Sequence, residues 1–173
     1  FAINASTGVL TVANSVALDF EVTPSFALVI KVQDNGTGTL SSQATVTISL
    51  TNTNEVPVIT NQAFSVAENS ANGTNVGTVV ASDPDAGQTL TYSILSGNTG
   101  SAFAINASTG VLTVANSVAL DFEVTPSFAL VIKVQDNGTG TLSSQATVTI
   151  SLTNTNEVPV ITNQAFSVAE NSA

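Results

Sequence analysis

Residues 1–71 of this chain recur without a single change at residues 103–173. Because Phe103 repeats Phe1, the period is 102 residues, and only residues 72–102 occur once. A period of this length is too long for one turn of a solenoid and has the size of a small domain. The chain is therefore expected to hold more than one and a half units of a longer array of identical domains.

The composition excludes several classes of protein. The chain has no Cys, His, Met or Trp. It contains two basic and twelve acidic residues, which gives a net charge of −10. So acidic a chain is not expected to bind nucleic acid or anionic membrane surfaces, and it holds no apolar run long enough for direct membrane insertion. Because no disulfide can stabilise the fold, a metal ion is the obvious substitute.

Alternation of apolar and polar residues predicts β-strands. In residues 44–50 every even position is apolar and every odd one is Ser or Thr, which is typical of a half-buried antiparallel strand. The complete unit is expected to have about seven strands, at roughly 62–67, 75–81, 90–95, 102–106, 110–114, 127–135 and 144–153. Turn sequences such as Asn72-Gly73 separate them. Short, regular strands predict an all-β fold of tandem Greek-key, seven-stranded, immunoglobulin-like β-sandwiches.

The segment Thr51–Pro57 and its copy at residues 153–159 predict the domain boundaries. Proline cannot donate to the ladder of a central strand, so Pro57 suits the start of a domain. The expected division is residues 1–55 as the C-terminal part of one repeat, 57–157 as a complete repeat, and 159–173 as the first strand of a following repeat.

The acidic residues are clustered, and each 102-residue unit holds seven of them beside one Lys. Carboxylates without basic partners repel one another unless a cation lies between them. Oxygen ligands in a chain without His or Cys predict Ca²⁺ rather than zinc or copper. The twelve are Asp19, Glu21, Asp34, Glu55, Glu68, Asp83, Asp85, Asp121, Glu123, Asp136, Glu157 and Glu170.

The sequence offers little for catalysis. It has no His or Cys to act as base or nucleophile, and no glycine-rich phosphate loop. Paired carboxylates occur in glycosidases, but these pairs recur with the unit, and a catalytic site has no reason to recur in every module. The chain is therefore not expected to be an enzyme.

Five motifs, taken together along the unit, resemble the calcium motifs of cadherin repeats. They look like the family's x-E-x, L-D-R-E, D-x-D, x-D-x-x-G and D-x-N-D-N-x-P patterns. The Thr- and Asn-rich, Cys-free style is similar to the cadherin-like repeats of large bacterial surface adhesins. The motifs are Ala67-Glu68-Asn69, Leu120-Asp121-Phe122-Glu123, Asp83-Pro84-Asp85, Val134-Gln135-Asp136-Asn137-Gly138 and Asn154-Thr155-Asn156-Glu157-Val158-Pro159.

The resemblance implies that Ca²⁺ binds between consecutive domains. The number of ions stays open, because the linker has an amide, Asn52, where the family has a carboxylate. The second junction would use Glu68, Asp121, Glu123, Asn154, Asn156 and Glu157. The first junction would use Asp19, Glu21, Asn52, Asn54 and Glu55 from one domain and Asp83, Asp85 and Asp136 from the next.

The resemblance also implies an extracellular or cell-surface location. Calcium would stiffen the repeats into a spacer or stalk of an adhesin or surface fibre. Two alternatives remain: a self-assembling filament subunit whose identical modules polymerise into a homo-oligomer or fibre, and a directly adhesive module that binds its own kind or a glycan. In each case the expected partners are neighbouring identical repeats.

Overall fold

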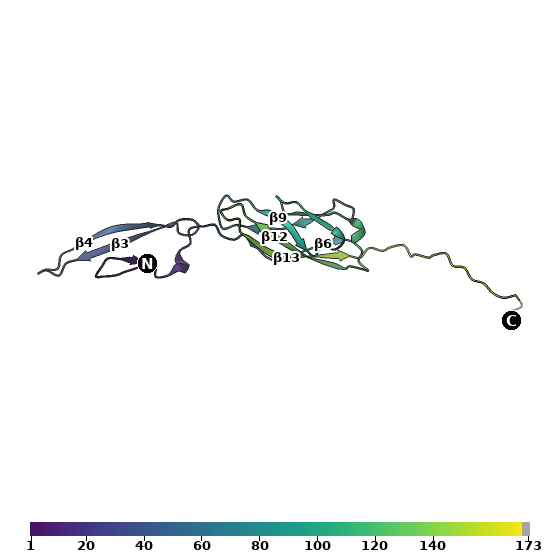
Figure 1. Cartoon of the computed structure of the whole chain (residues 1–173), viewed down its shortest axis with the longest axis horizontal. Coiled ribbons are helices and arrows are strands. Elements are labelled where there is room, and N and C mark those ends of the chain that lie inside the picture. The colour runs from purple at the N-terminus through teal and green to yellow at the C-terminus, as the bar shows by residue number, and fades with distance from the viewer. Residues whose placement is uncertain (171–173) are drawn as a thin grey trace. The chain divides into compact units, whose positions relative to one another are not determined.

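A computed structural model describes residues 1–170 of the chain (Figure 1). This part consists of β-strands with short 3-10 turns at Ser15–Ala17, Thr99–Ser101 and Ser117–Ala119. None of its helices has the length and apolar character needed to cross a bilayer. The chain divides into two compact units. Unit 1 comprises Phe1–Ile59, Val80–Thr91 and Val134–Gln145, and unit 2 comprises Thr60–Val79, Tyr92–Lys133 and Ala146–Ala173.

Two sheets form the predicted β-sandwich. One sheet contains four strands side by side (Figure 1), in the order β6 (Gln62–Ala67), β13 (Ser143–Thr153), β12 (Ser127–Gln135) and β9 (Thr91–Ser96). The other contains β10 (Phe103–Ile105), β11 (Val111–Val114) and β7 (Asn75–Thr78). Strand β6 is parallel to β13, whereas β11 is antiparallel to both of its neighbours.

The core of unit 2 follows the period-two pattern of the sequence. Strand β12 buries Leu130 and Ile132, and β13 buries Val148 and Ile150, all without measurable exposure. Burial of one such side chain contributes about 1.5–3 kcal/mol. The alternation that predicted these strands therefore also selects the residues that join the two sheets.

Unit 1 contains three small antiparallel sheets. Strand β1 (Ala2–Ile3) pairs with β2 (Leu10–Thr11), β3 (Ser25–Gln33) with β4 (Ser41–Ser49), and β5 (Val58–Ile59) with β8 (Ala81–Ser82). Pro57, which precedes β5, is fully buried, and its carbonyl oxygen accepts a hydrogen bond from Ser144 Oγ at 2.5 Å. A buried proline at the start of β5 fits the role expected of this residue.

Identical residues of the two copies differ in burial. Val134 on β12 is fully buried, but the equivalent Val32 on β3 is 68% exposed. Strands β12 and β13 lie between β6 and β9 in a four-stranded sheet, whereas their copies β3 and β4 form a two-stranded sheet. The strands around a residue, rather than the local sequence, therefore decide how deeply it is buried.

Two strand predictions differ from the structure. The single strand expected at 75–81 is divided: β7 ends at Thr78 and β8 begins at Ala81, in different sheets. The change occurs at the buried Val79, whose N–H donates to the carbonyl of Gly110. Residues 159–170 form no strand, and 171–173 lie outside the described part. The equivalent β5 and β6 are strands because they pair with β8 and β13.

Candidate metal centre

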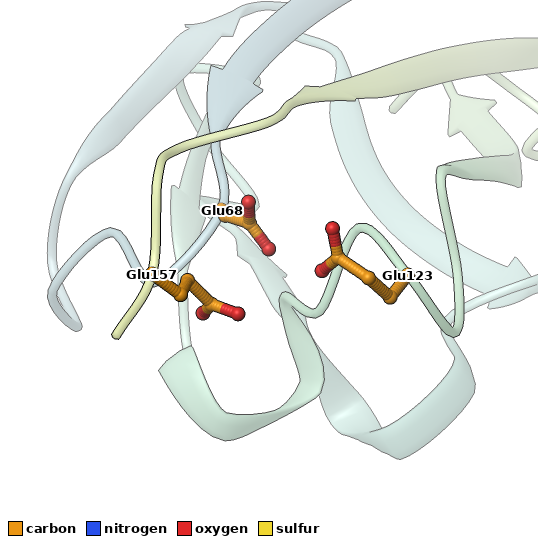
Figure 2. Close-up of side chains that lie close together, drawn as sticks. All are labelled: Glu68, Glu123 and Glu157. Atoms are coloured by element: carbon orange, nitrogen blue, oxygen red, sulfur yellow. The ribbon is translucent and has the colours of Figure 1, made fainter. Parts of the chain in front are cut away.

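Three glutamates of unit 2 point their carboxylates toward one another (Figure 2). Glu68 follows β6 directly, Glu123 lies in the loop before β12, and Glu157 lies in the segment after β13. One carboxylate oxygen from each lies within 4.8 Å of the others. Three acids far apart in the sequence are therefore gathered at one end of the four-stranded sheet, since β6 and β13 run parallel and end together.

Glu68 is fixed as an anion by backbone donors. Its side chain is only 3% exposed, and its two oxygens accept hydrogen bonds from the N–H groups of Thr155 at 2.6 Å and Phe122 at 2.9 Å. The bonds from Thr155 and Phe122 lower the pKa of Glu68, against the opposing effect of burial, and Glu123 lowers it further. The group is therefore charged and held in place at neutral pH.

Amides surround the other two glutamates. Asn154 Nδ2 donates to Glu123 Oε1 at 2.7 Å, and Asn69 Nδ2 donates to Glu157 Oε1 at 2.7 Å. Of the remaining predicted residues, Asp121 Oδ1 accepts from the N–H of Val124 at 2.9 Å. Asn156 is exposed and its side chain makes no hydrogen bond within residues 1–170.

Acidification is expected to weaken the Glu68 contacts. The pKa of Glu68 lies below its ordinary value of 4.5, so the carboxylate's contribution to stability is fully present above pH 4.5 and is lost as the pH falls through the folded pKa. Thermal unfolding in calcium-free buffer should show this loss, and Glu68→Gln should reduce the slope of Tm against pH. The equivalent change at the exposed Glu170 is the control. A slope that Glu68→Gln leaves unchanged would contradict this role.

Unit 1 buries two of the other predicted acidic residues, Asp85 and Asp136, whereas Asp19, Glu21 and Glu55 are exposed. Asp85 is 5% exposed, and its Oδ1 and Oδ2 accept from Asn52 Nδ2 at 2.8 Å and from the N–H of Glu55 at 2.9 Å. Asp136 is 4% exposed and accepts from the N–H groups of Gly138 and Leu142. The linker residues and the two buried carboxylates therefore lie together.

Asp83 has one carboxylate oxygen that lacks a donor. Its Oδ1 accepts from the N–H of Asp85 at 2.9 Å, but its Oδ2 is buried and has no hydrogen-bond partner. A buried charged oxygen without a partner is costly. A cation at this position would satisfy Oδ2. This unpartnered oxygen is the observation that best supports a metal among the oxygen ligands of unit 1.

Glu55 lies among other acids of the same unit. Its pKa is raised, first by burial and then by repulsion from Glu21, Asp19 and Asp85. The sign is opposite to that of Glu68: folding is favoured most below pH 4.5, and this advantage is lost as the pH rises through the raised pKa of Glu55. A bound cation would remove the repulsion, because it stabilises the charged form of every carboxylate around it.

Three polar residues contact predicted site residues or their motifs without having been predicted as ligands, two of them in unit 1 and one, Asn69, in unit 2. Gln88 Nε2 donates to Asn54 Oδ1 at 2.6 Å, Asn137 Oδ1 accepts from the N–H of Thr89 at 2.9 Å, and Asn69 contacts Glu157. Asn69 and Asn137 each follow the acidic residue of a motif, Glu68 and Asp136. Their position next to a predicted ligand could therefore have marked them as part of the site. Gln88 carries no sequence signal, because it is an ordinary polar residue in a turn.

The donor set is that of a hard cation. Carboxylate and amide oxygens are the ligands that Ca²⁺ prefers, at a coordination number of six to eight. In unit 2 the ligands at hand are Glu68, Glu123 and Glu157. Among the described residues of unit 1, no three carboxylates gather as closely as these.

Comparison with known proteins gives the family. The model of the cadherin domain matches residues 1–51 and 62–153. Rat Protocadherin Fat 2 is 36% identical over 180 residues, and Cadherin-87A of Drosophila melanogaster is 35% identical over 184 residues. These alignments cover 99% and 100% of this chain. The chain spans only 4% and 9% of the two relatives.

Solved structures agree with the sequence match. The structure of mouse Cadherin-23 EC22-24 matches with a TM-score of 0.68 and 26% identity, over 90% of this chain and 50% of that one. Protocadherin Gamma B2 extracellular cadherin domains 1-5 match with a TM-score of 0.65 and 30% identity, over 80% of this chain and 28% of that one.

The chain belongs to the cadherin family. Cadherin domains are extracellular adhesion modules rather than enzymes, and calcium binding is a general property of them. The predictions of fold class and of an extracellular location are therefore confirmed. The relatives named above are animal proteins, so they do not bear out the expected likeness to bacterial adhesins.

Proposed function

We propose that this chain is a calcium-rigidified structural repeat, a stiff spacer or stalk within an extracellular adhesin or surface fibre. The observation that carries the proposal is the convergence of Glu68, Glu123 and Glu157, with carboxylate oxygens within 4.8 Å of one another. Such a group repels itself unless a cation neutralises it. Calcium bound there would join the end of β6, the loop before β12 and the linker after β13.

We also propose the domain division that the linker sequence predicts. The complete repeat would run over residues 57–157, after the C-terminal part of a repeat at 1–55. Residues 159–173 would be the first strand of a following repeat only when they are paired, as the equivalent β5 and β6 are with β8 and β13. Burial of Pro57 at the start of β5 supports the first boundary. In this division each acidic cluster includes a linker glutamate, Glu55 or Glu157, so calcium acts on the linkers rather than on the cores.

Calcium is expected to stiffen the chain. The acids around Glu55 repel one another without a cation, so a chelator should let the linker sample more conformations, and added Ca²⁺ should restrict it. Small-angle scattering of the chain in Ca²⁺ and in chelator measures this as a change in the radius of gyration and in the longest distance. Identical scattering curves would reject the spacer. The control is the triple variant Glu68→Gln, Glu123→Gln, Glu157→Gln. It should lose the part of the response that comes from calcium bound at the unit 2 cluster.

Self-assembly is a second candidate, and one observation favours it. A similar solved structure, that of Protocadherin gammaB7 EC3-6, is a cis-dimer. Sedimentation at rising concentration in Ca²⁺ separates the two candidates, because a spacer remains monomeric whereas a filament subunit forms larger species.

We also propose that the chain is part of a bacterial protein. The chain has no Cys and is rich in Thr and Asn, which supports a bacterial surface adhesin. Neighbouring repeats that are identical in sequence fit a long stalk, in which each module has the same mechanical task.

A further inference from the structure

We propose that Asn72-Gly73 is a modification site, at which the chain deamidates when the loop between β6 and β7 opens, and which the folded repeat otherwise protects. Asparagine before glycine is prone to this reaction, because glycine has no Cβ to shield its backbone nitrogen. Both residues lie within unit 2. The inference does not rest on the proposed role of calcium, since neither residue is among the candidate ligands.

The reaction consumes only water. The backbone nitrogen of Gly73 attacks Cγ of Asn72, an N–C bond forms, and the side-chain nitrogen leaves as ammonia with the proton that the backbone nitrogen loses. Water then opens the cyclic imide at one of its carbonyl carbons. The product is either aspartate or isoaspartate, in which the main chain runs through the former side chain and is one carbon longer.

The fold holds the attacking nitrogen in place. Gly73 has a φ of 87°, and the N–H of Thr74 donates to the carbonyl oxygen of Ala71 at 3.1 Å, as in a type II turn. The N–H of Gly73 donates to the carbonyl oxygen of Val114 at 2.7 Å, and the N–H of Val114 donates back to Thr74 at 2.9 Å. Val114 is the last residue of β11. The nitrogen of Gly73 therefore cannot reach Asn72 until this pair of bonds opens.

The fold also holds the group under attack. Asn72 Oδ1 accepts a hydrogen bond from the N–H of Ser117 at 2.7 Å, 45 residues along the chain. Asn116, which precedes the 3-10 turn at Ser117–Ala119, makes no capping bond of its own, and its Nδ2 donates to the carbonyl oxygen of Gly100 at 2.9 Å. Asn72 thus caps this turn in its place. Its side chain is exposed, so water reaches it once the cap is released.

Isoaspartate at position 72 prevents the loop from closing again. The added carbon lies between Asn72 and Gly73, so it displaces the Gly73 N–H from Val114 while Thr74 remains bound on the other side. The two hydrogen bonds of Val114 therefore cannot form together in the modified chain. Deamidation at this site is an irreversible record that the loop has once been open.

Peptide mapping by mass spectrometry on the whole chain, aged at mildly alkaline pH, tests the proposal. Asn72 should deamidate at least about tenfold more slowly in the folded chain than in urea at the same pH, because the loop must first open locally. The retardation should be at least as large as the protection of the Gly73 amide against hydrogen exchange, since that exchange needs part of the same opening. Equal deamidation rates in buffer and in urea would overturn the proposal.

Ser117→Pro tests the hold on the side chain of Asn72. Proline removes the N–H that Asn72 accepts, and it suits this position because Asn116 before it is already extended, with φ −139° and ψ 98°. Deamidation of Asn72 should become severalfold faster in the folded variant and stay the same in urea. Ser117→Ala keeps the N–H and is the matched control. A folded Ser117→Pro chain, verified by protected amides in β13, that reacts no faster than Ser117→Ala would contradict the proposal.

Asn72→Asp separates the effect of charge from that of chain length. It supplies the carboxylate of one product without lengthening the main chain, and a carboxylate oxygen also accepts from the N–H of Ser117. The Gly73 amide should therefore stay protected in this variant, whereas it should lose protection in the aged chain that carries isoaspartate. An isoaspartate chain with a fully protected Gly73 amide would refute the irreversible record.

Discussion

Replacement of Leu130 by alanine is expected to lower the free energy of unfolding by about 2–5 kcal/mol, the range for loss of a fully buried leucine side chain. Leu130 has no exposed surface and lies on β12, in the middle of the four-stranded sheet. The loss should appear in urea denaturation as a lower midpoint with an unchanged m-value, because the surface exposed on unfolding remains nearly the same.

The matched control is Leu28→Ala, at the equivalent position of the other copy. Leu28 is only partly buried, because β3 pairs with β4 alone. Its replacement should therefore cost less than about half as much, since the penalty depends on the apolar area removed from water. Equal losses at Leu28 and Leu130 would show that the two copies have the same core, contrary to the burial described above.

Glu68→Ala is expected to have the largest effect on calcium binding. Glu68 is the buried member of the three glutamates, and its loss removes a ligand and leaves the N–H groups of Phe122 and Thr155 without an acceptor. The calcium affinity of the unit 2 cluster should fall by at least about tenfold, since even residues behind metal ligands act in the 10–100-fold range. Isothermal titration calorimetry measures this change.

Glu170→Ala provides the control for this experiment. Glu170 repeats Glu68 in sequence but is exposed, so its loss should leave the affinity of the unit 2 cluster unchanged. If Glu68→Ala retained full affinity, the three glutamates would not be a calcium site. A folded Glu68→Ala chain, shown by circular dichroism, is required before either outcome is interpreted.

Much of the fold follows from the sequence because period-two alternation reports burial directly. Strands β12 and β13 lie close to where the alternation in 127–135 and 144–153 puts them. The run at 75–81 was misjudged because alternation says which face of a strand is buried, not which partner it has. Thr78 and Ala81 belong to different sheets, and only long-range pairing decides that.

The acidic residues of the candidate site were predictable from the sequence, whereas one of its neutral residues was not. The resemblance to the cadherin calcium motifs implied Glu68, Glu123 and Glu157 as ligands of the second junction, and the structure brings these three together. Gln88 was not predictable, because neutral amides in turns are common and only the folded chain shows that this one contacts Asn54.

The parallel pairing of β6 with β13 has a mechanical consequence. The chain enters the sandwich near β6 and leaves it through β13, and six residue pairs join these strands, from Gln62 opposite Val148 to Ala67 opposite Thr153. Tension on the two ends pulls the strands past each other, so the hydrogen bonds between them are loaded together rather than opened one after another. A pulled repeat must shear this whole ladder before the residues between β6 and β13 bear force.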